Sequence, residues 1–156
     1  MDGEGLIENE TGAQRLIGYV LDVGRGDGSA RCWLDVGPQH TNRHGMLHGG
    51  LIVSILDNAM GATGSLTVSP DGRAPFLTVS MTTQFHAPAR LGDRITATGR
   101  VTGGGRSLLF IAGELVDRDG RLIATASGVF KPVPPHRRGA EPDAQAQTQA
   151  QAEAET

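Results

Sequence analysis

The pattern of apolar positions predicts one long amphipathic helix in the middle of the chain, over residues 49–67. Apolar side chains recur there at the i, i+3, i+4, i+7 and i+8 positions, which line one face of a helix. These positions hold Ile52, Ile55, Leu56, Ala59 and Met60. The helix therefore buries a single stripe, and it is the only substantial helix that the pattern predicts.

Elsewhere the apolar residues alternate with a period of two, as they do in strands that bury one face. Two such runs precede the helix and four follow it: residues 16–23, 30–36, 76–85, 94–101, 107–116 and 121–130. Asp119-Gly120 predicts a tight hairpin between the last two runs. One helix covers only part of one face of such a sheet. The sequence therefore predicts an α+β hotdog fold, in which a curved, mainly antiparallel sheet wraps a long central helix.

The chain has 156 residues, which is close to the usual size of a single domain. We expect this domain over residues 15–131, after an irregular N-terminal arm over residues 1–14. Residues 132–156 begin with prolines and continue as a run rich in Ala, Gln and Glu. Because this segment has no apolar face to bury, we expect a disordered tail.

Charge and composition exclude several classes of protein. A net charge of −3 gives no attraction to a phosphate backbone, so we expect no nucleic-acid partner. No apolar run approaches the roughly 18 residues of a membrane span, so we expect no membrane partner. The single cysteine, Cys32, excludes an intrachain disulfide framework and a cysteine-based zinc site, and we expect no bound metal. One thiol fits a reducing compartment, which favours a cytoplasmic protein.

Two consecutive glycines, Gly49 and Gly50, open the predicted helix. The first N–H groups of a helix lack partners within it and lie at the positive end of its dipole. A glycine lets a ligand oxygen approach these groups closely, as an oxyanion hole requires. The same two glycines also suit a tight turn into the helix, and the residues alone leave both interpretations open.

Asp57 lies on the same helix, away from the centre of the buried stripe. The nearest positions on its face hold only small residues: Gly50, Ser54, Gly61 and Gly64. An interior glycine costs a helix about 1 kcal/mol relative to alanine, which indicates that a backbone or a thin ligand packs along this row. A partly desolvated carboxylate there is a candidate general base or nucleophile. The alternative is a surface aspartate bonded to a neighbour such as Asn58.

The spacing of Gly49 and Asp57 limits how they can act together. They are eight residues apart in the sequence, which is about 12 Å along a helix. If both act on one carbonyl group, they must come from two chains whose helices run antiparallel about a two-fold axis. We therefore expect a homodimer with two composite sites, and we expect the row of small residues to lie near the seam between the chains.

These residues form part of a larger motif. Asn42 is followed after five residues by His48-Gly49-Gly50 and after six more by Asp57, and the segments 78–81 and 85–93 follow. Over about residues 16–131 the chain resembles the hotdog-fold acyl-CoA thioesterases of the phenylacetate-degradation type. The resemblance implies hydrolysis of a thioester between an acyl group and coenzyme A. It also implies homodimers that often pair into tetramers, and coenzyme A is then part of the substrate, so no separate cofactor is expected.

The resemblance also implies roles for individual residues. Asp57 corresponds to the carboxylate that activates water or attacks the thioester carbonyl, and Gly49 to the backbone N–H that polarises this carbonyl. Asn42 matches a position whose amide helps to hold the water or the thioester. Thr78 lies where a hydroxyl commonly orients the water or the carboxylate. His48 belongs to the motif, and either a catalytic role or a loop-holding role is open to it.

The family places a basic residue and a glycine-rich hairpin beside the nucleotide of coenzyme A. Arg90 and the residues Gly103, Gly104, Gly105, Arg106 and Ser107 fit these two places. Guanidinium and exposed N–H groups suit phosphates. A plain turn flanked by a solvated arginine explains the segment equally well. Arg137 and Arg138 are further candidates for phosphate contacts.

Two other functions remain as alternatives. One is a non-catalytic module that binds acyl-CoA, and the other is a hotdog hydratase or dehydratase. Such enzymes pair a histidine with a carboxylate, whereas here His48 precedes Asp57 by nine residues without their usual motif. Release of free thiol separates hydrolysis from both alternatives. The sequence leaves the acyl group open between a small aromatic and a medium aliphatic chain.

Overall fold

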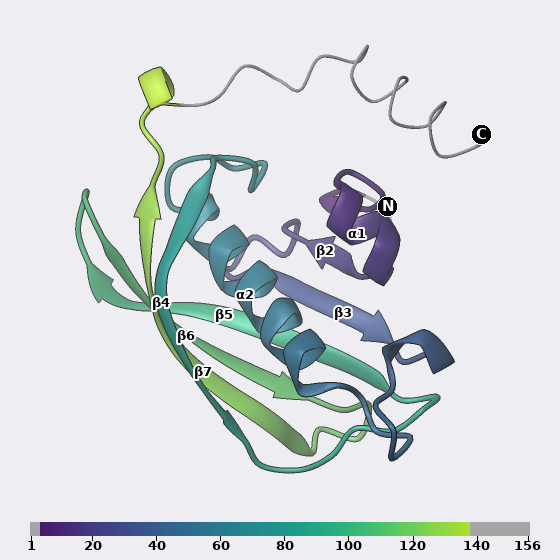
Figure 1. The fold of residues 1–156 in the computed structure, drawn as a ribbon. Helices are drawn as coiled ribbons and strands as arrows, with labels where there is room; N and C mark the ends of the chain where they lie inside the picture. The colour runs from purple at the N-terminus through teal and green to yellow at the C-terminus, as the bar shows by residue number, and fades with distance from the viewer. Residues whose placement is uncertain (1–3, 138–156) are drawn as a thin grey trace.

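The computed structural model describes residues 4–137. A seven-stranded sheet curves around one long helix, α2 (Gly49–Leu66) (Figure 1). The strands are β1 (Leu6–Ile7), β2 (Val20–Asp22), β3 (Arg31–Asp35), β4 (Phe76–Phe85), β5 (Arg94–Gly104), β6 (Leu109–Val116) and β7 (Leu122–Pro132). They lie in the order β1-β2-β3-β5-β6-β7-β4, and every neighbouring pair is antiparallel. The predicted α+β architecture of a long helix wrapped by a curved antiparallel sheet is confirmed.

The central helix forms where its periodicity predicts, and its apolar stripe faces the sheet. The five stripe residues Ile52, Ile55, Leu56, Ala59 and Met60 are all buried. Glycines in the strands let the helix approach the sheet closely, since a methyl group at Gly99 would overlap Thr63 on α2. The core of the domain therefore lies between α2 and the concave face of the sheet. None of the helices in residues 4–137 is long and apolar enough to cross a membrane.

One of the small residues on α2 is required by packing within the chain. A Cβ atom at Gly64 would lie 3.1 Å from a ring carbon of Phe76, and one at Gly61 would lie 3.9 Å from a ring carbon of Phe130. Gly64 therefore makes room for the ring of Phe76 on β4 of the same chain, whereas Gly61 is in ordinary contact with Phe130 on β7. The expectation that the row lies near a seam between two chains stays a prediction.

The N-terminal arm is more ordered than we expected. Within the described part of residues 1–14 lie β1, which pairs with β2, and the start of α1 (Gly12–Ile17). Helix α1 begins at an N-cap, Thr11, and ends at Gly18, whose φ of 87° is in the left-handed region. The strand expected over residues 16–23 is consequently reduced to the three residues of β2.

A single buried side chain holds this arm together. Gln14 is 2% exposed. Its side chain accepts a hydrogen bond from the Glu10 N–H and donates to the carbonyl oxygens of Ile7 and Tyr19. Buried polar groups need such partners, so these bonds fix the path of the arm into the sheet.

The hairpin after β6 forms where the sequence predicts it, and the last strand ends close to the expected end of the domain. The hairpin between β6 and β7 turns at Gly120, whose φ is 81°. Strand β7 ends at Pro132, one residue past the expected end of the domain, and a short 3-10 turn, η2 (Pro135–Arg137), follows. Residues 138–156 of the expected tail, which include Arg138, lie outside the described residues.

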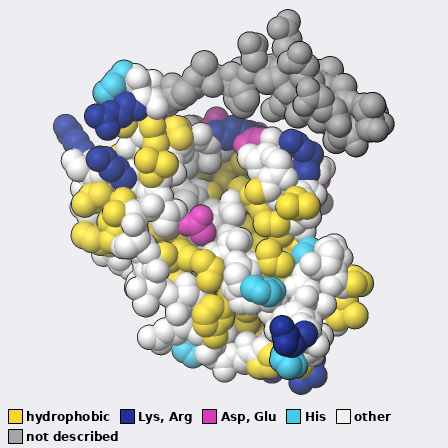
Figure 2. Space-filling view, in the orientation of Figure 1, with side chains coloured by type: hydrophobic (Ala, Val, Ile, Leu, Met, Phe, Trp, Pro, Cys, Tyr) yellow, Lys and Arg dark blue, Asp and Glu magenta, His cyan; other side chains and the backbone are white. Residues whose placement is uncertain are grey.

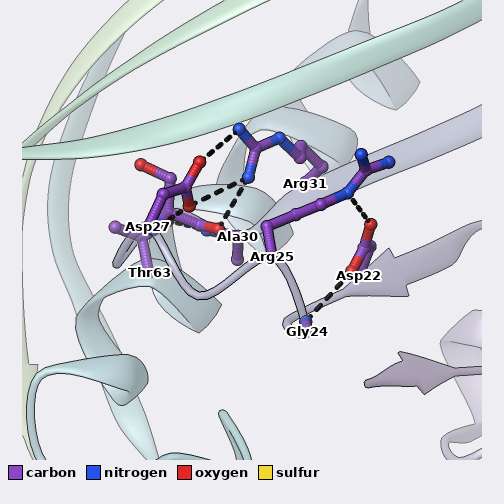
Figure 3. A network of polar contacts seen from close by, with 8 residues as sticks. Asp22, Gly24, Arg25, Asp27, Ala30, Arg31 and Thr63 are labelled. Atoms are coloured by element: carbon purple, nitrogen blue, oxygen red, sulfur yellow. Dashed lines mark hydrogen bonds and ion pairs between the residues drawn. The ribbon is translucent and has the colours of Figure 1, made fainter. Parts of the chain in front are cut away.

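The loop between β2 and β3 is held by a polar network (Figure 3). Arg31 pairs with Asp27 at 2.7 Å, and Asp22 pairs with Arg25 at the foot of the loop. The Ala30 N–H donates to the buried Thr63 Oγ1 on α2 at 3.0 Å. An exposed ion pair such as that of Arg31 with Asp27 contributes little, about 0–1 kcal/mol. Among these polar contacts, the buried bond to Thr63 is the one that reaches the helix.

Candidate active site

The structure brings Asp57 and Thr78 together. The Thr78 hydroxyl on β4 donates a 2.6 Å hydrogen bond to Asp57 Oδ1 on α2. Thr78 lies two residues after Phe76, whose ring contacts the helix at Gly64, so both side chains point to the concave side. The carboxylate is therefore oriented from the strand opposite its helix.

A β-bulge follows directly after this contact. Strand β4 pairs with β7 through Thr78↔Phe130 and then Ser80↔Val129, so Val79 is the extra residue. A bulge bends a strand and changes which side chains face each side. Beyond the bulge Phe85 again faces the helix, and its ring lies 3.5 Å from where a Cβ atom of Gly49 would be.

The second carboxylate oxygen of Asp57 is open. Within residues 4–137 Thr78 is the only hydrogen-bond partner of this side chain, and no arginine or lysine forms an ion pair with it. Asp57 is half-buried. A half-buried carboxylate with one oriented and one open oxygen can accept a proton from a water molecule.

Tyr19, a tyrosine near the Asp57 carboxylate, is neutral at neutral pH. Burial raises the pKa of Tyr19, and the negative charge of Asp57 raises it further. The Tyr19 hydroxyl donates to Asn58 Oδ1 at 2.9 Å, and the Asn58 amide donates to Ser54 O. Asn58 is thus engaged with these groups and not with Asp57. Sequence reasoning missed Tyr19, because its contact with α2 spans 39 residues.

The start of α2 leaves one N–H group available. His48 is the N-cap, and its Nδ1 accepts a hydrogen bond from the Gly50 N–H at 3.0 Å. The Gly49 N–H makes no hydrogen bond to any residue of the described part of the chain. Gly49 is half-buried, and a glycine leaves the approach to its own N–H unobstructed. The bond from the Gly50 N–H gives His48 the local contact expected of its loop-holding role.

Asn42 lies in a tight turn before the helix. Its side-chain oxygen accepts hydrogen bonds from the His44 N–H at 2.9 Å and the Met46 N–H at 3.2 Å. These bonds fix the orientation of the side-chain amide and leave its NH₂ group as a donor. The turn therefore presents one oriented donor close in sequence to the start of α2.

The two halves of the expected site are apart in a single chain. Gly49 lies beside Phe85 at the end of β4, whereas Asp57 lies beside Thr78 near its start. The helix itself separates them by about 12 Å along its axis. Within one chain the half expected to polarise a carbonyl group and the half expected to activate water therefore cannot reach the same carbonyl group.

The candidates for binding coenzyme A lie at opposite ends of β5. Arg90 is exposed before this strand, and it pairs with Met46 in an isolated bridge. The segment over residues 103–107 lies at the far end of the strand, about 30 Å along it at roughly 3.3 Å per residue. A methyl group at Gly104 would overlap the Leu108 carbonyl, so the turn itself requires this glycine. The two candidates cannot meet on one phosphate within a single chain.

Cys32 is not a candidate nucleophile. Its side chain is fully buried. Burial raises the pKa of the thiol far above its usual range. The reactive form of cysteine is the thiolate, so this residue packs the core and takes no part in chemistry.

A curved antiparallel sheet around one long helix is the hotdog fold, and Asp57 and the open Gly49 N–H lie on that helix. The family model of the thioesterase superfamily matches residues 44–124, a range that includes the start of α2, Asp57 and Thr78. The chain belongs to the thioesterase superfamily, and we class it as a thioester hydrolase.

Individual relatives agree with this assignment. Human acyl-coenzyme A thioesterase 13 is 35% identical over 112 residues, which are 71% of this chain and 78% of that protein. The structure of the Escherichia coli PaaI protein from the phenylacetic acid degradation operon has a TM-score of 0.69 at 22% identity, over 80% of this chain and 86% of that chain. Zebrafish thioesterase superfamily member 2 has a TM-score of 0.59 at 30% identity, over 69% and 75% of the chains. The predicted resemblance to PaaI-like hotdog thioesterases is confirmed.

Proposed function

We propose that this protein hydrolyses the thioester of an acyl-CoA to the free acid and coenzyme A. The observation that carries the proposal is the 2.6 Å bond from Thr78 to Asp57, which leaves one carboxylate oxygen open to water. The names of the sequence relatives favour acyl-CoA as the substrate. The acyl groups to be tested are a small aromatic and a medium-chain aliphatic group.

In the proposed mechanism Asp57 acts as a general base. Its open oxygen takes a proton from water while the water oxygen attacks the carbonyl carbon of the thioester. The Gly49 N–H and the Asn42 amide hold the negative charge that develops on the carbonyl oxygen. The carbon–sulfur bond then breaks, and the proton on Asp57 passes to the departing sulfur. The products are the acid and the free thiol of coenzyme A, and the step needs only water as co-substrate.

The rate contribution of each half of the proposed site can be estimated. General-base assistance contributes about 10²–10⁴-fold. One donor to the developing oxyanion contributes about 10²–10³-fold. Loss of either half alone should therefore reduce turnover by at least about a hundredfold.

The active unit in this proposal is a homodimer. Strand β4 is one of the two edges of the sheet, and its exposed side chains include Leu77, Val79 and Phe85, which are 59%, 58% and 56% exposed. Figure 2 shows hydrophobic side chains gathered on this side of the molecule. A long apolar edge strand favours pairing with another strand. Two β4 edges paired about a two-fold axis would set the two α2 helices antiparallel, with Gly49 of one subunit near Asp57 of the other.

The same arrangement accommodates both coenzyme A candidates. Arg90 lies on the Gly49 side, because it pairs with Met46 next to the start of α2. The turn over residues 103–107 lies on the Thr78 side, because Leu109 pairs with Phe130, which pairs with Thr78. In the dimer Arg90 of one subunit and Arg106 of the other would therefore flank the same composite site. A further pairing of dimers into tetramers is the other assembly that we propose to test.

The compartment follows from the thiol chemistry. The chain has a single cysteine, which is buried and free. Such cysteine usage suits a reducing compartment, so we place the reaction in the cytoplasm.

The test is release of free thiol from a panel of acyl-CoAs by the purified full-length protein. Phenylacetyl-CoA and octanoyl-CoA represent the two acyl classes, and crotonyl-CoA tests for hydration. Thiol release that is lost in Asp57→Asn supports the proposal. Tight binding without thiol release would instead indicate a binding module, and a change at the double bond of crotonyl-CoA would indicate a hydratase.

Mixed dimers test the composite site. Asp57→Asn and Asn42→Ala subunits are each expected to be inactive, because each breaks one half of every site. Random reassociation of equal amounts gives half mixed dimers, each with one intact site, so about a quarter of the wild-type rate should return. Mixtures that stay inactive although they exchange subunits would show that both halves act within one chain.

A further inference from the structure

His40 is a buried histidine at the end of the 3-10 turn η1 (Pro38–His40), between β3 and α2. It is 4% exposed, and both of its ring nitrogens are engaged. Nδ1 accepts a hydrogen bond from the Gly37 N–H at 2.8 Å, and Nε2 lies 2.6 Å from the carbonyl oxygen of Ile17. A carbonyl oxygen can only accept, so Nε2 carries the proton and the ring is neutral.

The ring joins two segments that are distant in the sequence. Ile17 is the last residue of α1, 23 residues before His40. A neutral imidazole offers one donor and one acceptor at a fixed separation, which an apolar side chain of similar size does not. The side chain thus ties the loop before α2 to the N-terminal part of the domain.

The backbone of His40 begins a small hairpin that leads to the site. Three backbone contacts join the two arms of this hairpin. The His48 N–H donates to His40 O at 2.9 Å, Thr41 and Leu47 form a bridge, and the Asn42 N–H donates to Met46 O at 2.7 Å. One arm carries Asn42, two residues after His40. The other arm ends directly before Gly49. The anchor at His40 therefore fixes the base of the hairpin that presents both donors of the carbonyl-polarising half.

We propose that His40 is a positioning residue for the thioester carbonyl, acting through this hairpin on the Asn42 amide and the Gly49 N–H. The inference rests on the proposed function, which assigns these two donors to the carbonyl oxygen. Such donors act only at the right distance, and a misplacement of about 1 Å can cost roughly a hundredfold in rate. His40 reaches neither the substrate nor Asp57 in this scheme, so its effect is on the geometry of the donors alone.

Two substitutions remove the two ring bonds separately. In His40→Asn the amide oxygen takes the place of Nδ1 and can accept from Gly37, whereas the bond to Ile17 is lost. In His40→Gln the amide nitrogen takes the place of Nε2 and can donate to Ile17, whereas the bond to Gly37 is lost. We expect each variant to lower kcat by about 10- to 100-fold, with a smaller change in KM. His40→Phe loses both bonds and should lose at least as much activity.

Thr63→Val is the matched control for a purely structural effect. Thr63 is another buried polar residue that joins two segments, through its bond from Ala30 N–H (Figure 3). It lies in the half of α2 remote from the hairpin. This variant should lower Tm as the His40 variants do and leave kcat within about twofold of wild type. If kcat falls with Tm in the same proportion for both residues, His40 has only a stabilising role and the proposal is wrong.

A double-mutant cycle tests the route of the effect. Asn42→Ala should lower kcat at least about a hundredfold in the wild-type background but by a clearly smaller factor when combined with His40→Asn, because its donor is already misplaced there. Full additivity of the two losses would contradict the proposal.

Amide hydrogen exchange gives a readout that needs no activity. Exchange over residues 40–50 should accelerate in the His40 variants and stay unchanged in Thr63→Val. Unchanged exchange in the His40 variants would show that His40 does not hold the hairpin in place. If the wild-type protein releases no thiol from any acyl-CoA while the exchange results hold, the proposed function is wrong and the structural role of His40 is still supported.

Discussion

The bond from Thr78 to Asp57 makes a direct prediction for the substitution Thr78→Val. Valine has nearly the same shape as threonine and suits a strand, so the change removes the hydroxyl and preserves the fold. Thr78 is exposed and Asp57 is half-buried, so the substitution leaves no fully buried group without a partner. We therefore expect Tm to stay close to that of the wild-type protein.

The expected loss of activity follows from the strength of the lost bond. A hydrogen bond to a charged group contributes about 1.5–3 kcal/mol, and about 1.4 kcal/mol corresponds to a factor of ten in rate. Water can replace part of the interaction at an exposed threonine, so we take the lower half of this range. We expect kcat to fall by about 10- to 40-fold, with KM nearly unchanged, because the hydroxyl orients the base and does not bind the acyl-CoA.

The assay is thiol release under saturating and limiting acyl-CoA, which separates kcat from KM. Thr78→Ser keeps the hydroxyl and should stay within about threefold of wild type. Thr82→Val is the matched control, since Thr82 is exposed on the same strand and pairs with Ser127, away from the helix. The reasoning fails if Thr78→Val keeps a kcat within twofold of wild type, or if Thr82→Val loses as much as Thr78→Val.

Two further predictions concern assembly and the buried thiol. Val79→Lys places a charge on the exposed edge of β4, so it should shift the protein from dimer to monomer in light scattering and abolish thiol release together with it, whereas a fully active monomer would refute the composite site. Burial raises the pKa of Cys32, so the native protein should not react with iodoacetamide at pH 8 and should react once unfolded. Rapid alkylation of the native protein would show that the thiol is accessible.

The central helix could be predicted because its signal is local and strong. Its apolar stripe spans several turns, and the pair of glycines marks its start. Helix α1 could not be predicted in the same way, because six residues are too few to show a period. Its N-cap at Thr11 and its C-cap at Gly18 were visible in the sequence, but the buried bonds of Gln14 that hold it depend on tertiary contacts.

The candidate site, like the fold, could be predicted from the sequence only in part. The arithmetic of the helix places Gly49 and Asp57 too far apart for one carbonyl group, and the structure agrees. The partner of Asp57 came from the family resemblance, because the bulge at Val79 interrupts the alternation of β4 and hides which of its residues face the helix. The row of small residues correctly indicated close packing at Gly64, where the ring that packs belongs to Phe76 of the same chain.

Each half of the proposed site is completed within its own chain before any association. Thr78 orients Asp57 from β4, and His48 engages the neighbouring Gly50 N–H so that the Gly49 N–H alone stays open. Because folding of each chain already orients these groups, association of two subunits would only have to bring the two halves close together. It follows that substitutions in one half should leave the geometry of the other unchanged. That independence is why the effects of Thr78 and His40 on turnover should multiply, whereas those of His40 and Asn42, which share a half, should not.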